Sequence, residues 1–336
     1  MDTGGGPPWQ QVVACSTFVK APPGPAIRVV PGAATVTSLT EPGWADSILG
    51  HASPGEPAII RIGHISDLHL ADRGRYPRNG FSARDCDRHS SKLAKGLLDA
   101  LREVEVDHLV VTGDLTLSSE SREFERAAEM LRWWAAAGKL TVVPGNHDVW
   151  TADAVDTGRF LRAVGADGKG MRRPVPTYPH VVPLGDVVLV ALDSARYGEA
   201  PHQTAGKIGA DQLRSARELC RQHQKAGKAT VLAFHHHVVL PPERVPSDVL
   251  VARMPLADAD QVIRLVAELP VAAVLHGHRH CAFRVDVPGA SHPTPILCSG
   301  SASRVADEPM RRARAYVYDF DATGLKGVEA LVSGPP

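Results

Sequence analysis

Short apolar runs rich in β-branched residues alternate with amphipathic segments along the chain. The apolar runs predict buried strands, and apolar positions that recur every three or four residues predict helices. We expect strands at residues 58–62, 109–112, 140–143, 230–234 and 271–275. We expect helices at residues 90–104, 121–137, 153–164, 211–224 and 258–269. This alternation indicates an α/β protein whose helices cover the faces of a sheet.

The pattern changes in the second half of the chain. Two runs at residues 180–183 and 187–192 flank the turn signal Gly185-Asp186, which predicts a hairpin. Four later runs are joined by turns without helices between them, at residues 282–287, 295–298, 315–320 and 328–332. We expect these four to form an antiparallel finish to a second sheet.

Side chains that can bind metals follow five of the strand-like runs. They are Asp67 and His69, then Asp114, then Asn146-His147-Asp148, then His235-His236-His237, and finally His278 and His280. Residues i and i+2 of an extended segment face the same way, so each two-residue spacing can direct two side chains at one ion. Oxygen and imidazole ligands of this kind are typical of a metal site, and we expect Asp114 to be shared between two ions.

Residues 1–56 are rich in Pro, Gly, Ser and Thr, so we expect a poorly ordered leader with one strand near residues 27–30 that docks on the body. The remaining residues 57–336 would form one folded domain. The chain has 37 basic and 37 acidic residues, which argues against a nucleic-acid polymer as partner. Its five cysteines form no CxxC pair, and it lacks a long apolar run and a secretory signal. We therefore expect a cytoplasmic protein.

In order, Asp67-x-His69, Gly113-Asp114, Gly145-Asn146-His147-Asp148, the histidine pair and Gly277-His278-x-His280 resemble the signature of the calcineurin-like metallophosphoesterases. The flanking residues look most like the bacterial branch of cyclic-nucleotide phosphodiesterases and glycerophosphodiesterases. The resemblance covers about residues 58–285. It implies a four-layer α-β-β-α sandwich of two mixed sheets, with metals at the carboxyl ends of the strands.

The resemblance also implies two divalent or mixed-valence ions, of Mn, Fe, Zn or Co. The first ion would be held by Asp67, His69, Asp114 and His280, and the second by Asp114, Asn146, His236 and His278. His147 would not be a ligand but would face the substrate. Asp148 could orient His147 or a ligand, or could cap a loop.

The expected reaction is hydrolysis of a small phosphate diester, such as a cyclic nucleotide or a glycerophosphodiester. Two ions about 3.5–4 Å apart lower the pKa of a bridging water, whose hydroxide attacks phosphorus. A phosphomonoesterase or pyrophosphatase that acts on a nucleotide or lipid precursor is the alternative, because the ions contact phosphoryl oxygens rather than the leaving group. A scaffold that kept the fold and lost catalysis should have eroded ligands, and none of the expected ligands is missing here.

One stretch departs from the branch pattern, which usually reads His-His-Pro-Pro. Here the three histidines at 235–237 are followed by three apolar residues before Pro241-Pro242. Alignment on the preceding apolar run favours His236 as the ligand, with His235 as the alternative. His237 is open to substrate contact or simple burial. We expect structural roles for the remaining conspicuous polar residues, namely His89, His276, His292 and the turn at residues 311–314.

Overall fold

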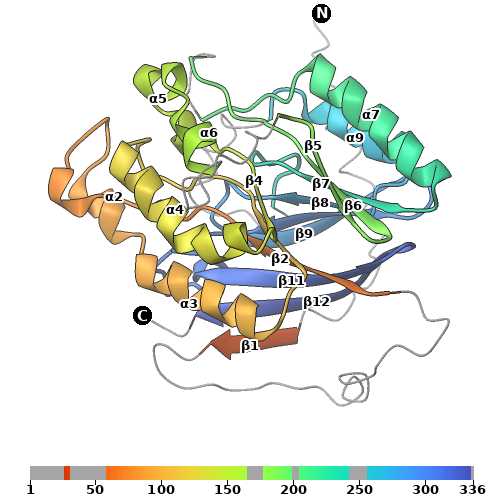
Figure 1. The fold of residues 1–336 in the computed structure, drawn as a ribbon, viewed down its shortest axis with the longest axis horizontal. Helices are drawn as coiled ribbons and strands as arrows, with labels where there is room; N and C mark the ends of the chain where they lie inside the picture. The colour runs from red at the N-terminus through yellow and green to blue at the C-terminus, as the bar shows by residue number, and fades with distance from the viewer. Residues whose placement is uncertain (1–25, 31–57, 165–176, 199–203, 242–255, 334–336) are drawn as a thin grey trace, which may run out of the picture.

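The computed structural model describes residues 26–30, 58–164, 177–198, 204–241 and 256–333. Two six-stranded sheets pack face to face, and helices cover the outer face of each sheet (Figure 1). The chain therefore forms the four-layer α-β-β-α sandwich of two mixed sheets that the sequence predicted.

The first sheet has the strand order β1-β12-β11-β2-β3-β4. Its strands are β1 (Ala26–Val30), β2 (Ile60–Ile65), β3 (His108–Val111), β4 (Leu140–Val142), β11 (Arg314–Asp321) and β12 (Gly324–Ser333). Strands β2, β3 and β4 are parallel, whereas β11 runs antiparallel to both of its neighbours. Strand β1 pairs with β12, so the strand expected near residues 27–30 is present and docks on the body. The rest of the leader lies outside the described residues.

The second sheet has the order β5-β6-β7-β8-β10-β9. Its strands are β5 (His180–Leu184), β6 (Val187–Ala191), β7 (Ala229–Ala233), β8 (Ala273–His276), β9 (Ala282–Val287) and β10 (Thr294–Ser299). The four central strands β6, β7, β8 and β10 are parallel, and an antiparallel strand closes each edge.

The predicted finish of the chain was wrong in one respect. Strands β9 and β10 complete the second sheet, but β11 and β12 return to the first sheet, where β11 pairs with β2. The apolar pattern of a strand shows which of its faces are buried, but it does not identify the strand with which it pairs. In a sandwich of two sheets, such a strand can be added to either sheet. Arg314 also differs from the expected solvated turn, because it lies in β11 with its side chain buried.

Three apolar cores hold the four layers together. The first lies between the first sheet and the helices α3 (Ser91–Glu103), α4 (Ser121–Ala136) and α6 (Arg159–Val164). The second lies between the second sheet and α7 (Ala210–Lys225) and α9 (Ala259–Glu268). The third joins the two sheets to each other. Two short helices, α2 (Ala83–Asp87) and α5 (Ala152–Asp156), belong to the connections around the strand ends. No helix in the described part of the chain has the length and apolar character needed to cross a bilayer.

Candidate metal centre

Five of the expected ligands have an unusual backbone conformation. Asp67, His69, Asp114, His278 and His280 all have positive φ angles, between 42° and 72°. This left-handed region is disfavoured for residues with a side chain, although Asp, Asn and His tolerate it best. Such strain persists only where neighbouring contacts hold it, and it concentrates at functional sites.

Backbone hydrogen bonds between the loops supply that support. The amide of Asp67 donates to the carbonyl of Gly113 at 3.0 Å, and the amide of His69 donates to the carbonyl of Asp114 at 2.9 Å. The amide of His278, from the second sheet, donates to Asp67 Oδ2 at 3.0 Å. The loops that follow β2, β3 and β8 are therefore tied to one another.

Two glycines allow these loops to come close. A Cβ atom at Gly113 would lie 2.6 Å from the amide nitrogen of Gly145 and 2.7 Å from Nδ1 of His235. A Cβ atom at Gly277 would lie 1.8 Å from Oγ of Ser66. A side chain at either position would therefore push apart the two sheets at the site.

The first group of potential ligands joins the two sheets. Asp67, His69, Asp114 and His280 each offer an atom that lies within 4.8 Å of the others. Nε2 of His280 is 3.1 Å from Asp67 Oδ1 and 2.8 Å from Nε2 of His69. Nε2 of His69 is 3.6 Å from Asp114 Oδ2. These four residues are the set that the resemblance implies for the first ion.

The second group is centred on His235. Its Nε2 atom lies 3.3 Å from Asp114 Oδ2, 3.2 Å from Asn146 Oδ1 and 3.2 Å from His278 Nδ1. Its Nδ1 atom donates to the carbonyl of Thr112, 2.6 Å away across the sheet interface. His235 is thus in the position that the alignment gave to His236.

Strand geometry explains this difference. Ala233 packs in the core between the sheets, whereas Phe234 packs in the core under α7 and α9. Side chains alternate along an extended strand, so His235 points with Ala233 toward the first sheet. Nδ1 of His236 lies 2.9 Å from Oγ of Ser194 and its ring packs beside His278, but a ligand atom of His236 also lies within 4.8 Å of those of His235 and His278. Both histidines therefore belong to this group, and the distances to Asp114 and Asn146 favour His235 over the expected His236.

Charge and burial oppose each other at the carboxylates. Burial would raise the pKa of Asp67 and Asp114, but the facing imidazoles, chiefly His280 for Asp67 and His235 for Asp114, hold both pKa values well below the usual range. Burial lowers the pKa of His278 far below its usual value. Burial also acts to lower the pKa of His235, but Asp114 raises it to about 9. A cation bound at His235 would therefore have to displace a proton.

The donor set fits a pair of metal ions. The two carboxylates, the amide oxygen of Asn146 and the imidazoles face one another across 2.8–3.6 Å, and nearly all are buried. Nε2 of His278 has no hydrogen-bond partner among the described residues. Mixed oxygen and imidazole donors suit Mn, Fe, Zn or Co, and a cation is what would satisfy so many buried lone pairs at once.

His147 lies at the edge of the two groups and is only partly buried. Its Nδ1 atom donates to the carbonyl of Leu117 at 2.7 Å, and its backbone amide donates to Asp114 Oδ1 at 2.8 Å. The ring stacks on Trp150 and contacts the edge of His69. These contacts fix its orientation beside the first group.

Asp148 caps the loop that carries Asn146 and His147. Its carboxylate accepts hydrogen bonds from the backbone amides of Gly145, Leu115 and Thr116 at 3.0–3.2 Å. Burial and the nearby Asp114 raise the pKa of Asp148 to about 7. Of the two roles considered, the contacts match the loop cap, which ties the loop after β4 to the loop after β3.

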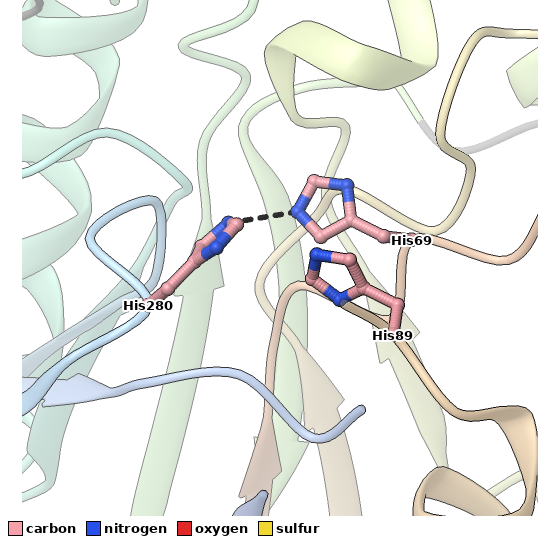
Figure 2. Close-up of side chains that lie close together, drawn as sticks. All are labelled: His69, His89 and His280. Atoms are coloured by element: carbon pink, nitrogen blue, oxygen red, sulfur yellow. Dashed lines mark hydrogen bonds between the residues drawn. The ribbon is translucent and has the colours of Figure 1, made fainter. Parts of the chain in front are cut away.

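Four further histidines that the sequence made conspicuous differ in their distance from the ligand groups. His276 is buried against Phe283, and His292 is exposed; neither belongs to a ligand group. His237 is buried and stacks on His278, with ring centroids 5.4 Å apart. His89, for which we expected a structural role, instead lies beside His69 and His280 (Figure 2). No sequence motif marks His89, because it follows a short helix rather than a strand.

Fold and site together define a metal-dependent phosphoesterase. The sequence matches the calcineurin-like phosphoesterase family over residues 60–282, and the chain belongs to that family. It is therefore a hydrolase that acts on phosphoric esters. The family generally binds a dinuclear metal centre, in agreement with the two ligand groups described above.

Individual proteins resemble this chain in sequence or in fold. A protein of Synechococcus sp. (strain WH7803), described as a probable cyclic nucleotide phosphodiesterase, is 30% identical over 226 residues, which cover 66% of this chain and 74% of that protein. The fold resembles a purple acid phosphatase of yellow lupin, with a TM-score of 0.50 and 10% identity over 84% of this chain and 55% of the phosphatase. A dimetal phosphatase of Danio rerio aligns with a TM-score of 0.48 and 16% identity over 82% of this chain and 99% of that one.

Proposed function

We propose that this protein is a metal-dependent phosphodiesterase that hydrolyses a small diester, such as a cyclic nucleotide or a glycerophosphodiester. The first ion would be held by Asp67, His69, Asp114 and His280, and the second by Asp114, Asn146, His235 and His278. When bound, such a pair supplies Lewis acidity and lowers the pKa of a water held between the ions.

Asp114 is the residue that connects the two groups. Its Oδ2 atom faces both His69, at 3.6 Å, and His235, at 3.3 Å. Its Oδ1 atom accepts the backbone amide of His147, so the carboxylate cannot rotate without breaking that hydrogen bond. A fixed carboxylate between the two groups supports its proposed role as the shared ligand.

The placement of His147 is the observation on which the proposed catalysis rests. Because Nδ1 donates to the carbonyl of Leu117, Nε2 is the ring nitrogen available to a substrate. Trp150 and Phe81 flank the ring, with centroids 5.1 Å and 5.2 Å from it. A histidine held this way can hydrogen-bond a phosphoryl oxygen or protonate the leaving alkoxide.

The preference for a diester rests on different support. The metal groups and His147 suit monoesters and diesters equally, because they contact phosphoryl oxygens and the leaving group. The 30% identity to the Synechococcus protein favours a cyclic nucleotide or similar diester. Zero formal net charge favours a small substrate over a nucleic-acid polymer.

A substrate panel on the manganese-loaded full chain tests this proposal. We expect hydrolysis of bis-p-nitrophenyl phosphate, a cyclic nucleotide or a glycerophosphodiester to exceed hydrolysis of p-nitrophenyl phosphate. His147→Ala should reduce the rate by about 100-fold or more. The control is His292→Ala, which removes an exposed histidine outside the ligand groups. Hydrolysis of monoesters or pyrophosphates alone would favour the alternative activity, and inactivity of the metal-loaded protein on every ester would refute the proposal.

A further inference from the structure

His89 lies where three segments of the chain meet. It belongs to the link between α2 and α3, and its backbone forms an isolated bridge with Arg304, in the link between β10 and β11. Only 8% of the residue is exposed. Its ring centroid is 4.5 Å from that of His69 and 5.5 Å from that of His280, and Figure 2 shows the three rings around one space.

Hydrogen bonds determine which nitrogen of His89 is protonated. Oγ of Ser303 donates to the carbonyl of Asp67 at 3.1 Å. Nδ1 of His89 is 2.7 Å from the same Oγ, which accepts from Nδ1 when its own proton serves the carbonyl of Asp67. In that arrangement Nδ1 carries the ring proton, and Nε2 carries a lone pair.

Among the described residues, the side-chain hydrogen bond of His89 is the one from Nδ1 to Ser303. A ligand atom of His89 lies within 4.8 Å of the ligand atoms of both His69 and His280. Two nitrogens that bind one ion at about 2.1 Å each are at most about 4.2 Å apart, so the three imidazoles lie within about half an ångström of the spacing that one ion allows. Burial and the facing imidazoles of His69 and His280 lower the pKa of His89, in agreement with a neutral ring.

The support behind the ring has the form usual for a metal-bound histidine. Such a histidine donates its other ring N–H to an oxygen that fixes its orientation, as Nδ1 of His89 does to Ser303. Ser303 is itself held, since its amide donates to Oγ of Ser301 and its carbonyl accepts the amide of Ser90. Ser301 and Ser303 both donate to the carbonyl of Asp67, so one hydrogen-bonded unit supports His89 and the loop of Asp67.

We propose that His89 is an additional ligand of the first ion, as a third imidazole beside His69 and His280. This inference rests on the proposed metal centre. With His89, the first ion has five protein ligands, namely Asp67, His69, His89, Asp114 and His280. Three of these are imidazoles, whereas the proposed second site has two. The first site should therefore bind its ion more tightly and favour Fe, Zn or Co over Mg.

Metal affinity and ligand count test this inference directly. His89→Phe keeps the ring volume and removes both nitrogens. In the zinc-loaded full chain we expect the His89→Phe change to lower the affinity for the more tightly bound zinc ion by about 10–100-fold. The affinity for the other zinc ion should stay the same, and chelator competition measures both. X-ray absorption should show fewer imidazole ligands per zinc. Ser303→Ala removes the hydrogen bond that orients the ring of His89. It should lower the affinity for the more tightly bound zinc ion by about tenfold.

His223→Phe is the matched control. His223 is also 8% exposed and also bonds a hydroxyl through Nδ1, that of Thr230, but it lies on α7 outside the ligand groups. The His223→Phe variant should bind zinc with the same affinity as the unmodified protein. If His89→Phe fails to fold, His89→Gln takes its place, with folding checked by circular dichroism.

The outcomes separate this inference from the proposed function. Unchanged zinc affinity and an unchanged imidazole count in a folded His89 variant would overturn the role of His89 and leave the phosphodiesterase proposal intact. A protein that binds two ions, loses affinity in the His89 variant and hydrolyses no ester would support His89 and refute the proposed function.

Discussion

The two sheets contribute different chemistry to the same site. Strands β2, β3 and β4 of the first sheet lead into all of the proposed oxygen ligands, Asp67, Asp114 and Asn146. Strands β7 and β8 of the second sheet lead only into imidazoles, those of His235, His278 and His280. His69 is the one imidazole of the proposed family set that comes from the first sheet. Neither sheet alone provides the mixture of donors that a pair of ions needs.

The site therefore depends on how precisely the sheets pack. The core between them consists largely of fully buried residues such as Ile62, Val110, Val231 and Leu275. Direct contacts then cross the interface at the strand ends, from His235 to the carbonyl of Thr112 and from the amide of His278 to Asp67. We therefore expect folding and metal binding to be coupled, because the same interface would serve both.

The largest effect should come from the carboxylate that both groups share. Asp114→Asn keeps the size of the side chain but removes the negative charge that faces His69 and His235. We expect a loss of activity well beyond the 10- to 100-fold typical of changes around metal ligands, of about 1000-fold, with loss of one or both ions. Steady-state kinetics and metal analysis measure this. Retention of both ions and of more than a tenth of the activity would argue against a shared ligand.

A second test compares two neighbours at the end of β7. His235→Ala removes the ring that faces Asp114 and Asn146, whereas His236→Ala removes a ring that bonds Ser194. We expect His235→Ala to lower activity by at least about 100-fold, and His236→Ala by about tenfold or less. Activities are compared at saturating metal. The reverse order would restore His236 as the ligand.

Asp148→Asn tests the support within the first sheet. The carboxylate accepts three backbone amides from the loops after β3 and β4. Its loss should destabilise the protein by about 1–3 kcal/mol, because buried amides lose an acceptor. Urea unfolding of the metal-free protein measures this, with Asp156→Asn, on the short helix α5, as control. Unchanged stability would show that these hydrogen bonds do not hold the two loops together.

An effect of similar size, but confined to acidic pH, should come from the opposite end of β3, away from the site. His108 is buried, bonds Oγ1 of Thr141, and has its pKa lowered by burial to about 4. Between pH 6.5 and about 4 the unfolded chain binds the additional proton, so stability falls as the pH decreases through this window. His108→Asn should remove about 1–3 kcal/mol of that acid sensitivity.

Urea unfolding of metal-free protein at neutral and mildly acidic pH measures the contribution of His108. The exposed His292 provides the control variant, His292→Asn. If His108→Asn and His292→Asn show the same pH dependence, the burial of His108 does not contribute to acid sensitivity.

The sequence predicted the α/β architecture and the positions of the ligand loops because both leave local signals. A buried strand that ends in Gly113-Asp114 or Gly145-Asn146 can be recognised without knowledge of its neighbours. The choice between His235 and His236 could not be made in this way. Every residue of β7 is buried, so its sequence lacks the alternation that would show which side chain faces the first sheet.

Two further features depend on tertiary packing alone. The pairing of β11 and β12 with β2 and β1 is decided by which sheet edge is open, which no local pattern records. The approach of His89 to His69 depends on the link between β10 and β11, through Ser303. A lone histidine after a short helix has no sequence feature that distinguishes it from a structural one.

Electron paramagnetic resonance of the manganese-loaded protein, with metal analysis of the same sample, tests most directly whether the two sheets hold a pair of ions around Asp114. We expect about two ions per chain and a spectrum of magnetically coupled manganese, because ions in such a site are about 3.5–4 Å apart. A single ion per chain, or two ions without magnetic coupling, would contradict the proposed centre.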